Sequence, residues 1–223
     1  MSEPSTAELL DFLGEYVTEN KRSKMARALD FRTRHLSIVL EDIYQPHNAS
    51  ACLRSCDCLG VQDIHVIEKR NEYRPNREVA MGSAKWLTLR QYNDTTDCLE
   101  RLKSAGYRII ATTPNEDGFT PVTLPLEGPA ALLFGTEEQG LSEEALALAD
   151  ETLRLPMFGF TQSFNISVTV AVTLSRLIER LHSADEAADW KLGREERDEL
   201  LLEWYRKIVT SHELLEDRQF GNG

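Results

Sequence analysis

Short apolar runs alternate with amphipathic stretches along most of the chain. Residues 36–43 (LSIVLEDI) and 130–135 (AALLFG) are compact apolar runs of the kind that form buried strands. Residues 48–60 (NASACLRSCDCLG) instead predict a helix, with Asn48 as a possible cap and Gly60 at its end. The same patterns predict strands within 63–69, 86–92, 107–113 and 152–157 and helices within 93–106, 142–150 and 165–182.

Helices at both ends of the chain are predicted as additions to that core. Ser5 and Glu8 form a capping box ahead of an amphipathic stretch, and a short basic helix follows it. Residues 194–209 (REERDELLLEWYRKIV) predict a last amphipathic helix. Because strands alternate with helices between these ends, we expect an α/β fold with a mostly parallel sheet flanked by helices. The expected parts are an N-terminal basic helical extension over residues 1–34, an α/β domain over 35–183 and a C-terminal helical extension over 184–223.

The composition fits a globular protein with one substantial core. The 223 residues are 41% hydrophobic and 28% charged. No run of about 18 apolar residues is present, so no membrane span is expected. The acidic N-terminus (MSEPSTAELLDFLGEY) is not a signal peptide, which favours a cytoplasmic protein.

The cysteines favour a reduced protein without a metal site. Cys52, Cys56 and Cys58 lie within seven residues, too close to one another for a disulfide framework. Their C-x3-C-x-C spacing matches no common zinc pattern. If this stretch is helical, Cys52 and Cys56 share a face and act as small buried hydrophobes. We therefore expect no metal ligands here.

The charge is unevenly distributed. The formal net charge of −12 by itself argues against a nucleic-acid partner. Residues 21–34 nevertheless carry six basic side chains and a single acid, Asp30. On charge alone, such a patch is either a phosphate-binding surface or a solvated helix face, and both readings stay open. A second basic group consists of Lys69, Arg70, Arg74 and Arg77.

Three polar loops follow predicted strands, where ligands of parallel sheets bind. None contains the G-x-G-x-x-G pattern of dinucleotide sites, and none is a phosphate-binding P-loop. The third loop places several polar residues before an apolar helix, although one cap residue is enough. This surplus of polar groups indicates that the loop also binds something else. The loops lie within residues 44–54, 134–142 and 155–165.

Taken together, motifs in these loops resemble those of the SPOUT class of RNA methyltransferases, and more closely its TrmH branch. The likeness extends over nearly the whole chain, and the middle and both helical ends are similar to the tRNA guanosine-18 enzymes of that branch. Leu155 and Phe164 stand where isoleucine and leucine are usual. The motif residues are Asn48 with Arg54 six positions later, then Gly135, Glu137 and Gly140, and then Leu155, Pro156 and Met157 followed by Ser163, Asn165 and Ser167.

The resemblance implies a fold and a cofactor. In this family the C-terminal part, here about residues 130–183, forms a deep trefoil knot, an exception to the rule against knots. The knot loops bind S-adenosyl-L-methionine largely through backbone groups. Glycines at 135, 140 and 159 would let these loops turn tightly around it. By the same resemblance, the cofactor-binding residues are Thr112, Gly135, Leu155, Met157 and Phe164.

The resemblance also implies catalytic and RNA-binding residues. The catalytic set is Arg54, Asn48, Glu137, Ser163 and Asn165. A free arginine is a very poor base because its pKa exceeds about 12, so we expect Arg54 to hold a phosphate and stabilise the forming alkoxide. The basic N-terminal segment is expected to bind tRNA through Lys21, Arg22, Lys24, Arg27, Arg32 and Arg34.

The expected activity is 2′-O-methylation of guanosine 18 in the tRNA D-loop by a homodimer whose subunits together complete the site. Two alternatives remain. One is the same chemistry on ribosomal RNA or on a wobble nucleotide, although the terminal helices favour guanosine 18. The other is an RNA-binding protein that has the fold but no activity. Loss of Arg54 or of the Ser-x-Asn loop would indicate this second alternative, and both are present.

Overall fold

The computed structural model describes residues 4–43, 45–69, 82–114, 117–183 and 190–221. These residues form two compact units. The sheet unit comprises the described residues from Thr33 to Trp190, and the terminal unit comprises those up to Arg32 together with those from Lys191 onward. Within the described ranges, no helix is long and apolar enough to cross a membrane.

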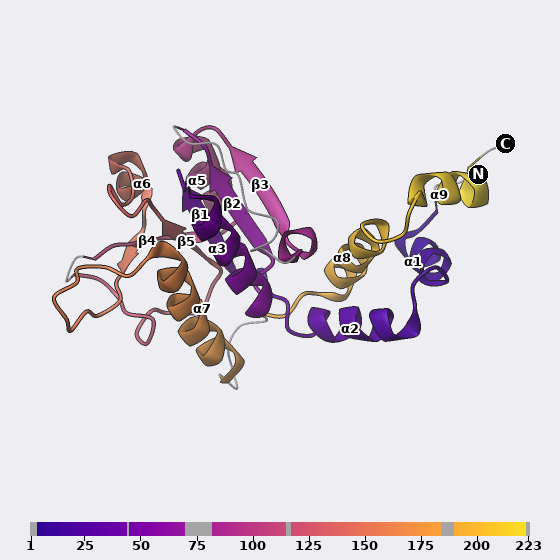
Figure 1. The fold of residues 1–223 in the computed structure, drawn as a ribbon, viewed down its shortest axis with the longest axis horizontal. Coiled ribbons are helices and arrows are strands. Elements are labelled where there is room, and N and C mark those ends of the chain that lie inside the picture. Colours follow the sequence, from indigo (N-terminus) through magenta and orange to yellow (C-terminus); the bar gives the residue numbers. More distant parts are fainter. Residues whose placement is uncertain (1–3, 44, 70–81, 115–116, 184–189, 222–223) are drawn as a thin grey trace. The chain divides into compact units, whose positions relative to one another are not determined.

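A parallel sheet forms the centre of the sheet unit (Figure 1). Its strands lie in the order β3-β2-β1-β5-β4-β6, and every described pair is parallel. Parallel strands require crossover connections, and helices lie in those from β1 to β2, from β3 to β4 and from β5 to β6. The strands are β1 (Leu36–Glu41), β2 (Asp63–Ile67), β3 (Thr88–Tyr92), β4 (Arg108–Thr112), β5 (Ala130–Phe134) and β6 (Glu151–Leu153).

Helices cover both faces of this sheet, because side chains of alternate residues point to opposite faces. From β1, Ile38 and Leu40 pack with α3 and α7, whereas Val39 packs on the other side with α5 and α6. Both clusters are buried, so the sheet is the middle of three layers. The helices are α3 (Pro46–Cys58), η1 (Ser83–Trp86), α5 (Thr95–Ser104), α6 (Glu143–Leu148) and α7 (Ile166–Ser183).

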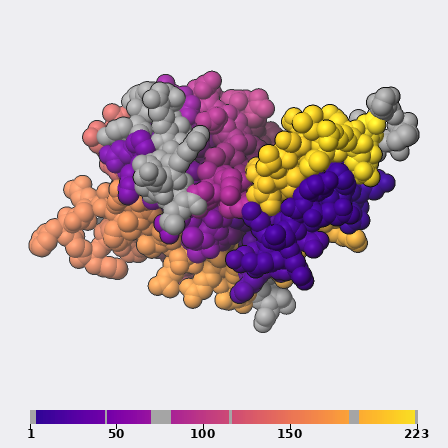
Figure 2. Space-filling view, turned by 45° about the vertical axis from the view of Figure 1, so that its right-hand side comes forward, coloured from indigo at the N-terminus to yellow at the C-terminus, as the bar shows by residue number. Residues whose placement is uncertain are grey.

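The terminal unit combines helices from both ends of the chain. Ser5 Oγ accepts a hydrogen bond from the Glu8 backbone N–H, and the Glu8 carboxylate accepts one from the Ser5 N–H, which forms the expected capping box. Figure 2 shows these N-terminal and C-terminal segments side by side, in indigo and yellow. Trp204 is fully buried in this unit. Its helices are α1 (Thr6–Gly14), α2 (Glu19–Leu29), α8 (Arg194–Arg206) and α9 (His212–Phe220).

The structure confirms the α/β fold, the parallel sheet and each predicted strand, and it corrects two details. Helix α3 begins at Pro46 with Gln45 as its N-cap, so Asn48 lies inside the first turn and is not the cap. The stretch at 194–209 is not the last helix, because α9 follows it. Cys52 and Cys56 are buried on one face of α3, as expected.

Candidate active site

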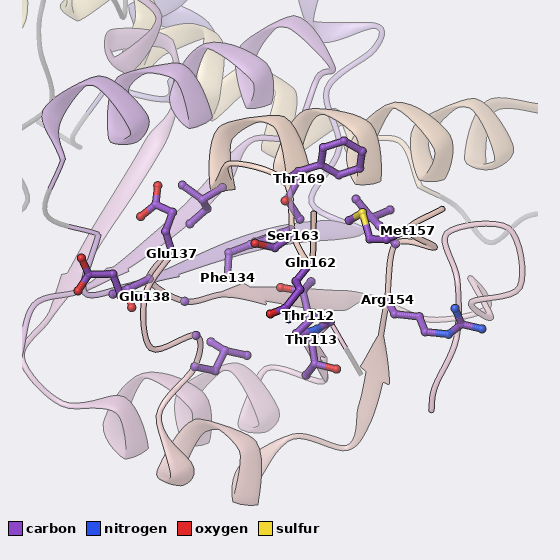
Figure 3. A pocket seen from close by; sticks show the side chains of 18 of the residues that line it. Thr112, Thr113, Phe134, Glu137, Glu138, Arg154, Met157, Gln162, Ser163 and Thr169 are labelled. Carbon is purple, nitrogen blue, oxygen red and sulfur yellow. The ribbon is translucent and has the colours of Figure 1, made fainter. Parts of the chain in front are cut away.

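A cleft of about 730 Å³ lies at the carboxyl ends of β4, β5 and β6, which end at Thr112, Phe134 and Leu153. Such edges of parallel sheets are where ligands bind, and the volume suits a small-molecule cofactor. In Figure 3, Glu137 lies on one side of the cleft and Met157 on the other. Seven of the ten residues predicted for catalysis or cofactor binding line the cleft, namely Thr112, Gly135, Glu137, Leu155, Met157, Ser163 and Phe164.

The loop after β5 forms one wall of the cleft. Thr136 and Gly140 exchange two backbone hydrogen bonds of 3.0 Å, so the chain turns back on itself within a few residues. Gly140 has a φ of 70°, in the left-handed region that favours glycine. A Cβ on Gly135 would fall on the carbonyl group of Gly140. Glycine is therefore required at 135 and favoured at 140. Gly159, by contrast, has open space around it and no positive φ, so nothing among the described residues requires a glycine there.

The loop before α7 forms the opposite wall, and Asn165 caps the helix that follows. Asn165 Oδ1 accepts hydrogen bonds from Ser167 N at 2.9 Å and from Ser167 Oγ at 2.7 Å. This arrangement satisfies an N–H group that a helix start leaves without an intrahelical partner. Ser163 and Phe164, just before the cap, line the cleft. The loop is therefore both a helix start and a cleft wall.

Side-chain hydrogen bonds join the three motif loops. Asn165 Nδ2 donates to Asn48 Oδ1 at 3.1 Å, and Asn48 Nδ2 donates to Gln45 Oε1 at 2.8 Å and to Glu137 Oε1. Asn48 is only 2% exposed, so this network is shielded from water, where a hydrogen bond to a carboxylate is strong. Residues from α3, the β5–α6 loop and the start of α7 are thus held at one end of the cleft.

Arg54 lies apart from this network. Its side chain is exposed, it is not among the residues that line the cleft, and no hydrogen bond or ion pair joins it to another described residue. Six residues along an α-helix correspond to a rotation of about 600°, so Asn48 and Arg54 point roughly 120° apart. Asn48, whose side chain bonds to Gln45, Glu137 and Asn165, therefore does not orient Arg54 within one chain.

The cysteine beside the network is inert. Burial, and secondarily the charge of Glu137, raises the pKa of the Cys52 thiol to about 12. The thiol therefore stays protonated at neutral pH and is a poor nucleophile.

Among the described residues, no group of three or more histidine, cysteine or acidic side chains could hold a metal ion.

Comparison with known proteins identifies the family. Residues 35–175 match the model of the SpoU rRNA Methylase family. The chain belongs to this family. It is 40% identical over 205 residues to the tRNA (guanosine(18)-2'-O)-methyltransferase of Borreliella burgdorferi, covering 92% of this chain and 93% of that protein. It is 36% identical over 190 residues to the enzyme of the same name from Thermus thermophilus, covering 85% and 98%. A solved TrmH/SpoU tRNA modifying enzyme of A. aeolicus superposes with a TM-score of 0.77 at 25% identity, covering 86% and 98%.

In this SpoU family member, some of the predicted RNA-binding side chains are exposed, and others are buried or paired within the protein. Lys21, Arg22, Lys24 and Arg27 are exposed on α2. Arg32 is 3% exposed, and its guanidinium lies over the Trp204 ring at 5.4 Å. This burial removes Arg32 from the side chains that can reach an external phosphate.

The remaining basic residues predicted from the sequence are also accounted for. Arg34 belongs to the sheet unit, where its Nε lies 3.1 Å from Asp63 Oδ2. Lys69 forms an ion pair with Glu144. The other members of the second basic group, Arg70, Arg74 and Arg77, lie outside the described residues.

Sequence reasoning missed some residues of the cleft. Thr113 and Arg154 line it, and Thr113 Oγ1 and Arg154 Nε are buried without a hydrogen-bond partner among the described residues. Both residues directly follow the ends of strands, at Thr112 and Leu153, so the rule that ligands bind at strand ends could have identified them. Unlike the Thr113 hydroxyl, the Thr112 hydroxyl has a partner, because it donates a hydrogen bond to the Leu133 carbonyl at 2.6 Å.

Proposed function

We propose that the protein is an S-adenosylmethionine-dependent methyltransferase that modifies the 2′-hydroxyl of guanosine 18 in the tRNA D-loop. The observation that carries this proposal is the 205-residue similarity to a relative named for that reaction. This alignment is longer than the whole sheet unit, so it extends into the terminal unit, whose helices a minimal wobble-nucleotide enzyme would lack. The cleft and its joined motif loops agree with the reaction.

The cleft fits the cofactor in size and in lining. Thr112, Gly135, Leu155, Met157 and Phe164 would hold it, through backbone groups at tight turns and apolar side chains at the walls. When bound, the cofactor supplies a methyl group activated by a sulfonium leaving group. The glycine at 135 lets the wall approach closely, since a Cβ there would meet the neighbouring backbone. We also propose that residues of about 130–183 form the trefoil knot of the family and that the protein acts in the cytoplasm.

In this mechanism the protein mainly positions the ribose. Asn48, Glu137 and Asn165 fix the walls relative to one another, and Ser163 faces the reacting groups. The 2′-hydroxyl would lose its proton, which passes to solvent, as its oxygen accepts the methyl group. A guanidinium that holds the adjacent phosphate stabilises the forming alkoxide, and Arg54 would supply it.

Arg54 lies outside the cleft of its own chain, which supports a homodimer. We propose that Arg54 of the partner subunit completes each site. An apolar stripe on and before α7, formed by Phe164, Val168 and Val172, is exposed beside the cleft. Val168 and Val172 lie four residues apart on one face of α7, and Phe164 continues the same spacing in the loop before it, as expected of a surface that a second helix covers. The exposed basic residues of α2 would bind tRNA phosphates.

The test is methyl transfer to an unmodified tRNA transcript, followed by mapping of the methylated nucleotide. A transcript with 2′-deoxyguanosine at position 18 is the matched control, because it lacks only the acceptor hydroxyl. Arg54→Ala should abolish transfer and leave cofactor affinity nearly unchanged. Methylation at a wobble nucleotide or only in ribosomal RNA would contradict the proposed substrate. Binding of tRNA without any transfer would favour a non-catalytic RNA-binding protein.

A further inference from the structure

A buried carboxylate ends β1, one of the two middle strands of the sheet, and lies outside the cleft. Glu41 is the last residue of β1 and is 4% exposed. It accepts three hydrogen bonds, from Thr95 Oγ1 at 2.7 Å, Ser142 N at 2.9 Å and Ser142 Oγ at 2.8 Å. Burying a carboxylate is costly unless such donors surround it. A charged residue at the end of an otherwise apolar buried strand therefore needs an explanation.

The donors to Glu41 come from the starts of two helices. Thr95 is the first residue of α5, and Ser142 is the N-cap of α6, where its Oγ also accepts from Ala145 N at 3.1 Å. The N-terminus of a helix carries a partial positive charge that favours an anion. Glu41 therefore connects β1 to both helix starts at the same point of the sheet.

One of these two contacts fixes the cofactor loop. Residues 135–141 all line the cleft, and Ser142 comes directly after them. The start of this loop is fixed by β5, which ends at Phe134 and is hydrogen-bonded on both sides. Its end is fixed by the Ser142 contacts to Glu41. Glu137, the hydrogen-bond partner of Asn48, lies between these two attachment points.

A second carboxylate supports the same helix from the surface. Glu144 accepts from Thr96 Oγ1 at 2.5 Å and pairs with Lys69. Its side chain is 36% exposed, and exposed ion pairs are screened by water and salt. The buried contacts of Glu41 are therefore the stronger constraint on the loop.

We propose that Glu41 is a positioning residue for methyl transfer, which sets the geometry of the cofactor loop through Ser142. This inference rests on the proposed function, since it concerns the cofactor cleft. Glu41 touches neither cofactor nor substrate. It acts by fixing the loop end, and so determines where Gly135 and Glu137 stand relative to the opposite wall.

The two partners of Glu41 allow a matched test. Ser142→Ala removes the side-chain contact at the loop end, and Thr95→Val removes only the contact to α5 while keeping the side-chain shape. Glu41→Gln keeps the shape of the carboxylate but replaces one acceptor oxygen with a donor. For these variants and the double variant Glu41→Gln/Ser142→Ala, S-adenosylmethionine affinity is measured by calorimetry, with Tm and the kcat and KM of methyl transfer alongside.

We expect Glu41→Gln and Ser142→Ala to weaken cofactor binding by at least about tenfold, because hydrogen bonds to charged groups are among the strong ones. Thr95→Val should lower Tm with cofactor affinity within about twofold of wild type, since α5 does not line the cleft. If Glu41 acts through Ser142, the double variant should bind S-adenosylmethionine no more weakly than whichever single variant, Glu41→Gln or Ser142→Ala, has the lower affinity.

The outcomes separate this inference from the proposed function. If the unaltered protein binds no S-adenosylmethionine, the proposed function fails and the inference fails with it. If the unaltered protein binds and methylates, but Glu41→Gln and Ser142→Ala lose no more affinity than Thr95→Val, only the inference is overturned. If Glu41→Gln does not fold, the comparison of Ser142→Ala with Thr95→Val decides in the same way.

Discussion

At the scale of single residues, Asn165 uses both ends of its amide at once. Its Oδ1 caps α7 by accepting from Ser167, and its Nδ2 donates to Asn48. A serine or an aspartate at this position could cap the helix equally well, but an ionised aspartate has no donor for Asn48. The amide is therefore needed because the residue is a cap and a link between two motif loops.

This double role predicts different effects for two substitutions at Asn165. Asn165→Ala should lower the free energy of unfolding by about 1 kcal/mol through loss of the cap, and it should also lower methyl transfer strongly. Asn165→Asp should keep Tm near the wild-type value, because a carboxylate caps a helix well, yet lose activity, because it faces Asn48 Oδ1 without a donor. Thermal melts and methyl-transfer rates would check both. Normal turnover in Asn165→Asp would show that Asn165 acts only as a helix cap and that its contact with Asn48 is not needed for activity.

Sequence reasoning reached only one half of this role. The polar residues before an apolar helix indicated a cap in this loop, because capping depends on neighbours two or three residues away. The contact with Asn48 spans 117 residues and depends on how the sheet brings α3 and α7 together. Asn48 looked like a cap for the same local reason. The structure shows that its side chain is instead used for long-range contacts.

At the scale of elements, the β5–α6 loop depends on a glycine that no side chain can replace. In Gly135→Ala the new Cβ would fall on the Gly140 backbone, so the loop that lines the cleft must move. We expect cofactor affinity to fall at least about tenfold, together with a loss of stability of roughly 1–3 kcal/mol. The control is Gly128→Ala, just before β5, where nothing lies within 4 Å of the added Cβ. Calorimetry on both variants tests this, and equal affinities would contradict the strain argument.

The β2–β3 pair contains a histidine that makes the sheet sensitive to acid. The pKa of His65 is lowered from 6.5 to about 4, mainly by burial and secondarily by the positive charge of Arg90, while the charge of Asp63 opposes the shift. The unfolded chain therefore binds more protons between pH 6.5 and about pH 4, so stability is complete above this window and falls as the pH drops through it.

His65→Gln should remove this dependence, because glutamine does not titrate. Between roughly pH 7.5 and pH 5, the unaltered protein should lose about 2 kcal/mol more unfolding free energy than the variant. Tyr92→Phe removes the hydroxyl that lies 3.1 Å from His65 Nδ1 but keeps the aromatic ring, so it should keep most of the pH dependence. Denaturant unfolding at both pH values measures these differences. Equal losses in His65→Gln and the unaltered protein would contradict the assignment.

How far the elements could be predicted depended on burial. Strands such as β1 and β5 are buried along their whole length, so their apolar runs were visible in the sequence. Helix α9 contains no buried residue and therefore has no apolar stripe that sets a period. The strand order could not be read locally, because crossovers place β5 between β1 and β4. Glu41 was overlooked for a related reason, since its partners lie 54 and 101 residues away.

At the scale of the whole molecule, a protein with a net charge of −12 is proposed to bind an RNA. In the structure, the side chains of the basic segment that are free to contact RNA are the exposed cations on α2. Arg32 is packed against the Trp204 ring, and Arg34 forms an ion pair with Asp63. A local patch attracts phosphate even when the total charge is negative, because salt screens distant charges beyond about 8–10 Å. The net charge therefore bears on long-range steering more than on the contact itself.

Salt dependence of tRNA binding tests this patch. Each phosphate contact contributes up to about −0.9 to the slope of log K against log salt, so Lys24→Ala/Arg27→Ala should flatten the slope by roughly one to two. The matched control is Arg101→Ala/Lys103→Ala, which removes the same charge from α5, where both side chains are ion-paired. The control should shift affinity only weakly and keep the slope. Affinity is measured over a salt series, and S-adenosylmethionine binding should be unchanged in both variants. Equal slopes in all three proteins would show that α2 is a solvated face and that tRNA contacts the chain elsewhere.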